Sequence, residues 1–234
     1  MTSKRLLDLT VASLLLLLLS PVFVLVAVAI RSESRGPIFY ASKRVGQNWR
    51  VFDFFKFRTM RVDADRLIKD VEHLNAYADD DGDASGVHGA QEAVLIGDDG
   101  WVGEAEMEAV LAKASFLKVE NDPRITRVGH FLRNTSLDEL PQLYNVVKGD
   151  MSLVGNRPLP LYEAETLTTD TDGERFLAPA GITGLWQVTE RGGRVVSEAS
   201  RKALDVEYAR VRSFWYDLTL LYRTLPATVQ RADV

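Results

Sequence analysis

The sequence contains no cysteine among its 234 residues, which excludes a disulfide framework and a zinc site with thiolate ligands. Its only histidines are His73, His88 and His130, and their wide spacing argues against a metal site built from imidazole groups. A chain of this length is long enough to form one domain of good size with a buried core.

Positive charge is scarce in one part of the chain. The formal net charge is −5, but residues 63–108 contain 14 Asp and Glu against 2 Lys and Arg, a net charge of −12. The remainder therefore carries a net charge of +7, which suits phosphate-bearing partners or an anionic membrane surface. We interpret residues 63–115 as a surface insertion, helical near 63–77 and 104–114, because their acidic, Gly-rich breaks lack the ligand spacing of a calcium loop. We expect no catalytic role for this insertion.

Charge is absent from Leu9 to Ile30, a run of 22 residues that is long enough to cross a bilayer as a helix. Ser20 and Pro21 lie in the middle of the run, where proline breaks the hydrogen-bond ladder and bends the helix. Basic residues flank both ends, so the positive-inside rule does not place the two ends on opposite sides. These flanking residues are Lys4, Arg5, Arg31 and Arg35. A re-entrant hairpin, a spanning anchor and a signal peptide cleaved after Ala27-Val28-Ala29 all remain open.

A β-hairpin is predicted from residue 38 to residue 57, where two aromatic and β-branched runs flank Gly46-Gln47-Asn48. Lys56 and Arg58 share a face by the two-residue period of a strand. These two cations could form a solvated strand edge, or they could contact phosphates or lipid headgroups beside a membrane.

Residues 134–150 are predicted to form one short helix. Ser136 and Glu139 have the spacing of a capping box, and Gly149 can end the helix in a left-handed conformation. Lys148 lies where the helix dipole favours a cation. The predicted apolar face consists of Leu137, Leu140, Tyr144 and Val147.

Asp138 and Glu139 are adjacent carboxylates at the start of this helix, where its dipole and unpaired N–H groups would keep them ionised. An ionised aspartate can act as a nucleophile, and a neighbouring glutamate can hold a hard cation such as Mg²⁺. The alternative is that this stretch only begins a helix with the capping box of Ser136 and Glu139 and has no catalytic role.

Arginines lie on both sides of this helix. Arg124, Arg127 and Arg133 precede it, and Arg157 follows it between Gly155 and Pro158, which favours display from a stiff loop. Arginine is well suited to a bidentate grip on phosphate oxygens, so a carboxylate nucleophile with several arginines would suffice for phosphoryl transfer.

The C-terminal third contains three further segments. Residues 178–194 form a Gly-bounded loop that is either an ordinary turn and strand or a wall for a nucleotide. Residues 197–212 show the pattern of an amphipathic helix that includes Asp205 and Tyr208. Residues 214–225 are rich in aromatic side chains, and they suit a membrane interface or a core equally well.

Together these motifs resemble the bacterial sugar transferases, and more narrowly the small monotopic polyprenyl-phosphate phosphoglycosyl transferases. The likeness covers nearly the whole chain except about residues 70–115. The four-helix membrane domain of larger relatives is absent. The motifs are Lys4-Arg5 with Asp8, Ser20-Pro21, Gly36–Tyr40, Arg44-Val45-Gly46, Lys56–Met60, Asp122–Thr126, Ser136–Gln142, Gly149–Ser152, Arg157-Pro158 and Gly181–Gly184.

The resemblance implies an α+β fold, predominantly helical, in a monotopic membrane protein with interfacial amphipathic helices. Residues 1–36 would form a re-entrant membrane helix broken at Ser20-Pro21. Residues 37–234 would form a catalytic domain on the cytoplasmic face of the bacterial inner membrane.

The resemblance also implies an activity. The family transfers a sugar 1-phosphate from a UDP-sugar to undecaprenyl phosphate and releases UMP, which initiates assembly of a bacterial glycan such as an exopolysaccharide. Asp138 matches the nucleophile that forms a covalent phosphosugar intermediate, and Glu139 matches the ligand of Mg²⁺. The expected partners are therefore the two substrates and a phospholipid bilayer, without nucleic acid, and a homodimer is one assembly to consider.

The expected phosphate-binding and substrate-binding residues are Arg133, Arg157, Pro158, Lys56, Arg58, Arg191 and Arg194. Of the last two, either could match the family arginine on the nucleotide side. Asn156 stands where the family usually has proline, which predicts a less rigid loop before Arg157. A non-catalytic scaffold of the same fold and a nucleotide-sugar hydrolase are the alternative functions.

Overall fold

The computed structural model describes residues 3–62, 64, 122–166, 170–191 and 198–227. Residues 1–59 and 127–234 form one compact unit, and residues 60–126 form another. In the second unit, Met60 pairs with Ile125 in a β-bridge, and the buried Arg124 forms an ion pair of 2.7 Å with Asp122. The acidic insertion predicted at 63–115 and its two helices lie outside the described residues, apart from residue 64. Everything below concerns the first unit.

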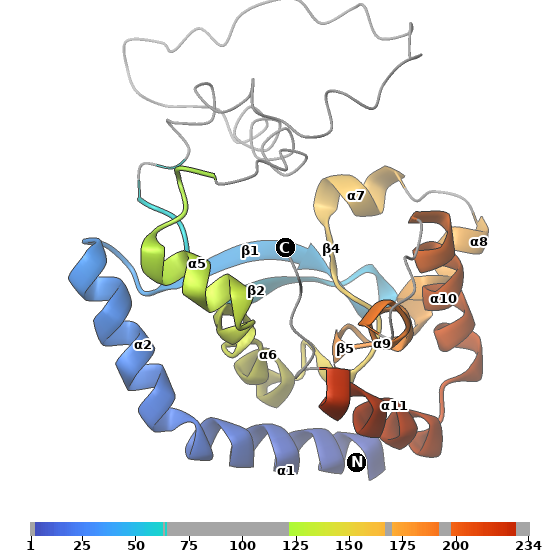
Figure 1. Ribbon diagram of the computed structural model, residues 1–234. Coiled ribbons are helices and arrows are strands. Elements are labelled where there is room, and N and C mark those ends of the chain that lie inside the picture. The colour runs from blue at the N-terminus through green and yellow to red at the C-terminus, as the bar shows by residue number, and fades with distance from the viewer. Residues whose placement is uncertain (1–2, 63, 65–121, 167–169, 192–197, 228–234) are drawn as a thin grey trace, which may run out of the picture. The chain divides into compact units, whose positions relative to one another are not determined.

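The apolar N-terminal run forms two helices, α1 (Ser3–Leu18) and α2 (Ser20–Glu33), which meet at an angle of 57° (Figure 1). Pro21 lacks the N–H that would bond the Leu17 carbonyl, and the Ser20 hydroxyl donates to that carbonyl instead, at 2.7 Å. The predicted bend is therefore confirmed. In the described ranges neither helix alone has the length and apolar character of a membrane span, whereas the bent pair together has both.

The predicted hairpin is also confirmed. Strands β1 (Phe39–Val45) and β2 (Val51–Phe57) pair antiparallel around a 3₁₀ turn at Gln47–Trp49, and β4 (Leu159–Pro160) pairs with the other edge of β1. A second, smaller sheet contains β3 (Ser152–Val154) and β5 (Gly181–Thr183) in parallel.

The segment predicted as one helix over 134–150 is not one helix. Helix α5 (Arg127–Asn134) is followed by a 3₁₀ turn, η3 (Leu137–Glu139), and then by α6 (Gln142–Lys148). Ser136 adopts a left-handed conformation with φ 55° and makes no capping hydrogen bond through its side chain, so the predicted capping box is wrong. The C-terminal end is as expected, because Lys148 lies in the last turn and Gly149 has φ 97°.

The predicted apolar face of this segment is also wrong in part. Tyr144 is 53% exposed, whereas Leu143 and Val146 are buried. Because the chain restarts its helix at Pro141, the residues that face the core differ from those expected of a continuous helix.

The C-terminal part is helical, which makes the fold α+β with helices predominant. Its helices are α7 (Leu161–Thr166), α8 (Asp170–Gly173), η4 (Glu174–Leu177), α9 (Leu185–Arg191), α10 (Glu198–Val211) and α11 (Phe214–Ala227). Helix α10 confirms the predicted amphipathic helix, and α9 occupies part of the predicted Gly-bounded loop. In helix α11, Leu220 is fully buried while Trp215 and Tyr222 are 74% and 75% exposed, so the segment belongs partly to the core, and its membrane interface remains a prediction.

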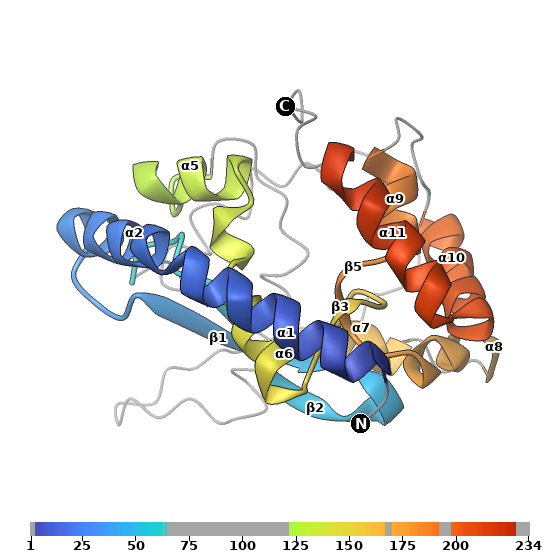
Figure 2. The ribbon, with the colours of Figure 1, turned by 90° about the horizontal axis from the view of Figure 1, so that it is seen from below.

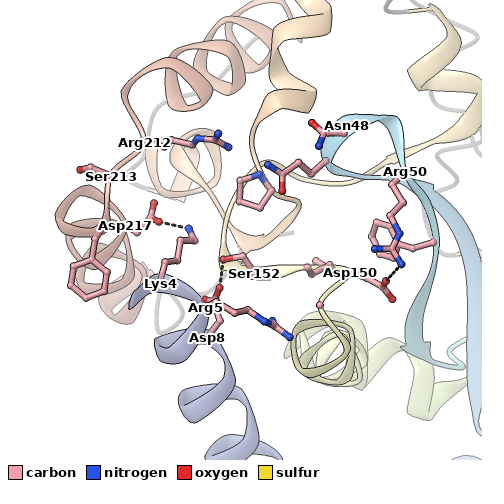
Figure 3. Close-up of a pocket in the computed structure, with 16 residues that line it drawn as sticks. Lys4, Arg5, Asp8, Asn48, Arg50, Asp150, Ser152, Arg212, Ser213 and Asp217 are labelled. Carbon is pink, nitrogen blue, oxygen red and sulfur yellow. Dashed lines mark hydrogen bonds and ion pairs between the residues drawn. The ribbon is translucent and has the colours of Figure 1, made fainter. Parts of the chain in front are cut away.

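The first turns of α1 are bound to the rest of the unit by charged side chains (Figure 3). Lys4 forms an ion pair with the buried Asp217 of α11 and donates to the Val154 carbonyl at 2.9 Å. The buried Asp8 accepts hydrogen bonds from the Ser152 hydroxyl at 2.8 Å and from a main-chain N–H of β3. These contacts join α1 to α11 and β3.

Arg5 makes a third connection. Its guanidinium donates to the carbonyls of Val146 and Val147, at 2.6 and 2.8 Å, in the last turn of α6. A cation there is favoured by the helix dipole and satisfies carbonyls that have no partner within the helix. The basic residues that the sequence suggested as flanks of a membrane segment are thus internal contacts at this end.

Figure 2 shows α1, α2 and α11 on the same side of this unit. Large apolar side chains of these three helices are exposed. They are Leu6, Leu14, Leu17, Leu18, Val24, Leu25, Val28, Trp215, Leu218 and Tyr222.

Candidate active site

The dyad of Asp138 and Glu139 lies in η3, between α5 and α6. The left-handed Ser136 turns the chain out of α5, and Pro141 begins the next helix, so the two acids occupy a single tight turn. Asp138 is buried, with 6% of its surface exposed, whereas Glu139 is half-buried. The turn thus holds one carboxylate inside the protein and the next one nearer the solvent.

Lys56 of β2 contacts both carboxylates. Its Nζ lies 3.3 Å from Oδ2 of Asp138 and 3.0 Å from Oε1 of Glu139. The ammonium also lies 5.7 Å from the centre of the Phe54 ring. The structure thus places Lys56, one of the phosphate-binding residues predicted from the sequence, in direct contact with the dyad.

Asn145 aligns β2 with α6 and so sets the position of Lys56. Its side chain is fully buried, accepts a hydrogen bond from the Phe55 N–H at 3.1 Å and donates to the Asp53 carbonyl at 2.6 Å. It therefore occupies main-chain groups at the outer edge of β2, as a neighbouring strand would. Sequence reasoning missed this residue, since its partners lie about ninety positions away.

The ionisation of Asp138 depends on Lys56 rather than on a helix dipole. Burial raises the pKa of Asp138 above its ordinary value, the Lys56 ammonium opposes that rise, and the neighbouring Glu139 adds to it. The expected source of ionisation, the start of a helix that continues to Lys148, is absent because η3 is a single 3₁₀ turn.

Arg133 lies in the last turn of α5, close enough to lower the pKa of Asp138. Its Nε donates to the hydroxyl of the buried Thr59 at 3.0 Å. The guanidinium is therefore oriented beside the dyad, and the phosphate-binding role predicted for it remains a prediction.

Arg157 is exposed on the loop between β3 and β4, and Pro158 behind it is buried. The Arg157 carbonyl accepts a hydrogen bond from Nη2 of Arg175 at 3.0 Å, and the same Nη2 lies 2.6 Å from Oδ2 of Asp205. Burial raises the pKa of Asp205 to about 6, although Arg175 opposes the rise. A buried ion pair therefore supports the loop that displays Arg157.

Asn156 stiffens this loop, contrary to the expectation from its replacement of proline. Its buried Nδ2 donates at 2.9 Å to the carbonyls of both Arg175 and Asp205. The loop also needs glycine, because a Cβ at Gly155 would come within 2.2 Å of the Pro179 carbonyl oxygen. Close backbone packing and side-chain hydrogen bonds together replace the rigidity of a proline.

The other predicted residues lie away from the dyad or outside the described part. Arg58 is buried beside the end of α2, where its Nη2 donates to the Ser34 carbonyl at 2.8 Å. Arg191 ends α9, and its side chain lies outside the described residues, as does the whole of Arg194. Ser20 and Pro21 lie at the break between α1 and α2. The binding roles predicted for Arg58, Arg191 and Arg194 remain predictions.

A separate cavity of about 610 Å³ lies at the other end of α6, against the first turn of α1 (Figure 3). Its walls include Lys4 and Asp217, whose ion pair joins α1 to α11, and Arg50, whose Nη2 lies 3.7 Å from Asp150. The dyad does not line this cavity. Within the described ranges, no three His, Cys, Asp or Glu side chains gather around a common point to hold a metal.

The chain matches the family model described as bacterial sugar transferase over residues 1–231. It belongs to the bacterial sugar transferase family. Among relatives of this family, it is 36% identical to the exopolysaccharide production protein ExoY of Sinorhizobium fredii, over 96% of this chain and 84% of ExoY.

Other relatives in the family are longer. The chain is 38% identical to the galactosyl transferase CpsE of Streptococcus agalactiae serotype III, over 95% of this chain and 41% of CpsE. It is 34% identical to the undecaprenyl-phosphate galactose phosphotransferase of Salmonella typhimurium, over 97% of this chain and 40% of that protein. The chain thus spans about two fifths of these two relatives.

The contact between Lys56 and the dyad predicts a measurable titration. Lys56→Met should raise the pKa of Asp138 further, because it removes the ammonium that opposes the effect of burial. The shift can be followed by ¹³C NMR of carboxyl-labelled aspartate, with the Asp138 signal assigned by its loss in Asp138→Asn. Lys43→Met is the matched control, since Lys43 is exposed and pairs with Asp53 at 2.7 Å. An unchanged midpoint for Asp138 in Lys56→Met would contradict the role given to Lys56.

Proposed function

We propose that this chain transfers a sugar 1-phosphate from a UDP-sugar to undecaprenyl phosphate and releases UMP, through a covalent phosphosugar intermediate on Asp138. The observation that carries the proposal is the buried Asp138 carboxylate held by Lys56. The name of the Salmonella relative, an undecaprenyl-phosphate galactose phosphotransferase, supports the substrate class. The name of ExoY supports a role in exopolysaccharide production.

In the first step, an Oδ atom of Asp138 attacks the β-phosphorus of the UDP-sugar. The bond from this phosphorus to the bridging oxygen breaks, and UMP leaves with the bonding electron pair. In the second step, a phosphate oxygen of undecaprenyl phosphate attacks the same phosphorus. The aspartyl bond then breaks, which regenerates the carboxylate and yields a sugar diphospholipid.

Lys56 prepares both carboxylates for this reaction. It favours the ionised form of Asp138, which is the nucleophilic form, and it orients Glu139 beside it. Arg133 and Arg157 are proposed to neutralise the phosphates of the two substrates, because two anions otherwise repel at contact distance. Arg191 or Arg194 is proposed to contact the nucleotide.

Magnesium is proposed as the cofactor, with Glu139 as its protein ligand. Mg²⁺ is commonly bound by one or two carboxylates together with water and substrate phosphates, and the adjacent Asp138 and Glu139 fit that requirement. When bound, the ion would neutralise charge on the diphosphate.

We further propose that α1 and α2 form a re-entrant hairpin in the cytoplasmic leaflet of the bacterial inner membrane. Their bend at Pro21 and their exposed leucines and valines support this placement. The exposed Trp215 and Tyr222 of α11 suit the interfacial region beside the hairpin. This proposal favours a monotopic protein over the spanning anchor and the signal peptide.

Release of UMP from UDP-galactose and from UDP-glucose, with Mg²⁺ present, tests the activity. The proposal predicts about one UMP per enzyme without lipid acceptor, and continued turnover once undecaprenyl phosphate is added. Asp138→Asn should lower the rate at least about a thousandfold without changing the unfolding midpoint. Asp53→Asn, which alters an exposed aspartate, is the matched control and should retain activity.

The alternative functions give different results in the same assay. Continuous UMP release without lipid, together with free sugar phosphate, would identify a hydrolase. No UMP from any member of a panel of UDP-sugars would identify a scaffold. Substantial activity in Asp138→Asn would contradict the assignment of the nucleophile.

The proposed re-entrant hairpin of α1 and α2 can be tested by cysteine labelling, since the chain has no native cysteine. The re-entrant arrangement predicts that Ser3→Cys and Glu165→Cys react with a membrane-impermeant maleimide only after spheroplasts are lysed. Both positions are exposed on the protein surface, and they lie on either side of the hairpin in the sequence. Labelling of Ser3→Cys in intact spheroplasts, with Glu165→Cys protected, would instead establish a spanning helix.

A further inference from the structure

One face of the β1–β2 hairpin carries a second cation near Lys56. The strand register places Arg44 opposite Phe52 and Tyr40 opposite Lys56, with Phe54 between Phe52 and Lys56 on β2. Side chains that alternate along a strand share a face, and so do directly paired residues of neighbouring strands. Arg44 and Lys56 therefore lie on the same face.

This face is directed into the protein. Phe52 and Phe54 are 5% and 6% exposed and belong to the main hydrophobic core. Arg44 is half-buried beside them, and its Nε donates to the Ser42 hydroxyl at 3.4 Å. By contrast, the neighbouring Lys43 lies on the other face and is exposed.

Arg44 and Lys56 share the ring of Phe54. The Arg44 guanidinium carbon lies 5.6 Å from the ring centre, and Nζ of Lys56 lies 5.7 Å from it. The two cationic groups are therefore no farther apart than the sum of these two distances. Lys56 in turn contacts the dyad, so Phe54 and Lys56 connect Arg44 to the Asp138 carboxylate.

Arg44 is also adjacent to the strand that follows Arg157. It pairs with Pro160 of β4, and β4 begins at Leu159, two residues after Arg157. Strand β1, which carries Arg44, thus lies between β2, which carries Lys56, and β4, which follows the loop of Arg157.

We infer that Arg44 binds the α-phosphate of the UDP-sugar and stabilises the departing UMP. This inference rests on the proposed function. When Oδ of Asp138 bonds to the β-phosphorus, the electron pair of the broken bond passes to the bridging oxygen, which stays with UMP. The phosphate that becomes the UMP phosphate thereby goes from a charge of −1 to a charge of −2. A guanidinium that meets this oxygen gains interaction energy as the bond breaks, which lowers the barrier of the first step.

The role of Arg44 differs from that of Lys56. Lys56 donates to both carboxylates of the dyad and so acts on the nucleophile. An arginine can offer two parallel N–H groups to a phosphate and remains charged at any working pH. Arg44 therefore acts on the leaving group, and the second step, in which UMP takes no part, should not depend on it.

The test measures the two steps separately. For the first step, UMP release is followed without lipid acceptor. For the second step, the enzyme is fully converted to its phosphosugar adduct, freed of nucleotide, and mixed with undecaprenyl phosphate. Arg44→Gln should slow the first step about a hundredfold or more and leave the second unchanged. The affinity of the Arg44→Gln variant for UMP, measured by calorimetry, should be about tenfold lower than that of the wild-type chain.

Two variants control this test. Lys43→Gln removes the neighbouring exposed cation and should leave both steps and UMP affinity unchanged. Arg44→Lys keeps the charge without the bidentate geometry and should recover part of the rate of the first step. Unfolding midpoints of all variants establish whether the packing beside Phe54 survives.

Each outcome decides the inference. Loss of the first step alone, with weaker UMP binding and an unchanged unfolding midpoint, supports it. Equal losses in both steps, or full activity in Arg44→Gln, would overturn it. Failure of the wild-type chain to release UMP or to form an adduct would contradict the proposed function itself, which separates the two failures.

Discussion

The Lys56 ammonium contacts both carboxylates of the dyad, and the chemistry open to the site depends on this shared contact. Two adjacent acids, one of them buried, would otherwise favour a proton on one of them, and a protonated aspartate is a poor nucleophile. The position of Lys56 depends in turn on β2, which Asn145 joins to α6. Pairing at a strand edge, rather than a helix dipole, therefore prepares the nucleophile.

A second constraint joins the bent N-terminal helices to this site. Arg5 caps the end of α6, while Lys4 and Asp8 bind α11 and β3. Helix α6 begins just after the dyad. It therefore connects α1, which is proposed to enter the membrane, to the η3 turn that carries Asp138. In the proposed function, these contacts hold the nucleophile at a defined height relative to the lipid phosphate.

Local patterns in the sequence were sufficient for much of the fold. The bend follows from Pro21 within an apolar run, and the hairpin follows from two alternating runs around a turn. The helix over residues 134–150 was predicted wrongly because Ser136 adopts a left-handed conformation that its type and spacing do not reveal. A capping box needs a particular backbone as well as two suitable side chains.

The sequence suggested candidate residues for the site, but it did not reveal the contacts between them. Asp138, Glu139 and Lys56 were identified from sequence, but their mutual contact joins positions 82 and 83 residues apart. The support of Arg157 could not be predicted for the same reason, since Arg175 and Asp205 reach its loop from later helices. Long-range contacts of this kind follow from the packing of elements, which a single sequence does not specify.

The most direct test of this account is the mass of the protein stopped during the reaction. Enzyme incubated with a UDP-sugar and Mg²⁺ without lipid acceptor, quenched and digested, should yield a peptide heavier by one sugar phosphate, with the added mass on Asp138. Addition of undecaprenyl phosphate before the quench should remove that mass. An adduct on another residue, or UMP release with no adduct at any time, would contradict the account.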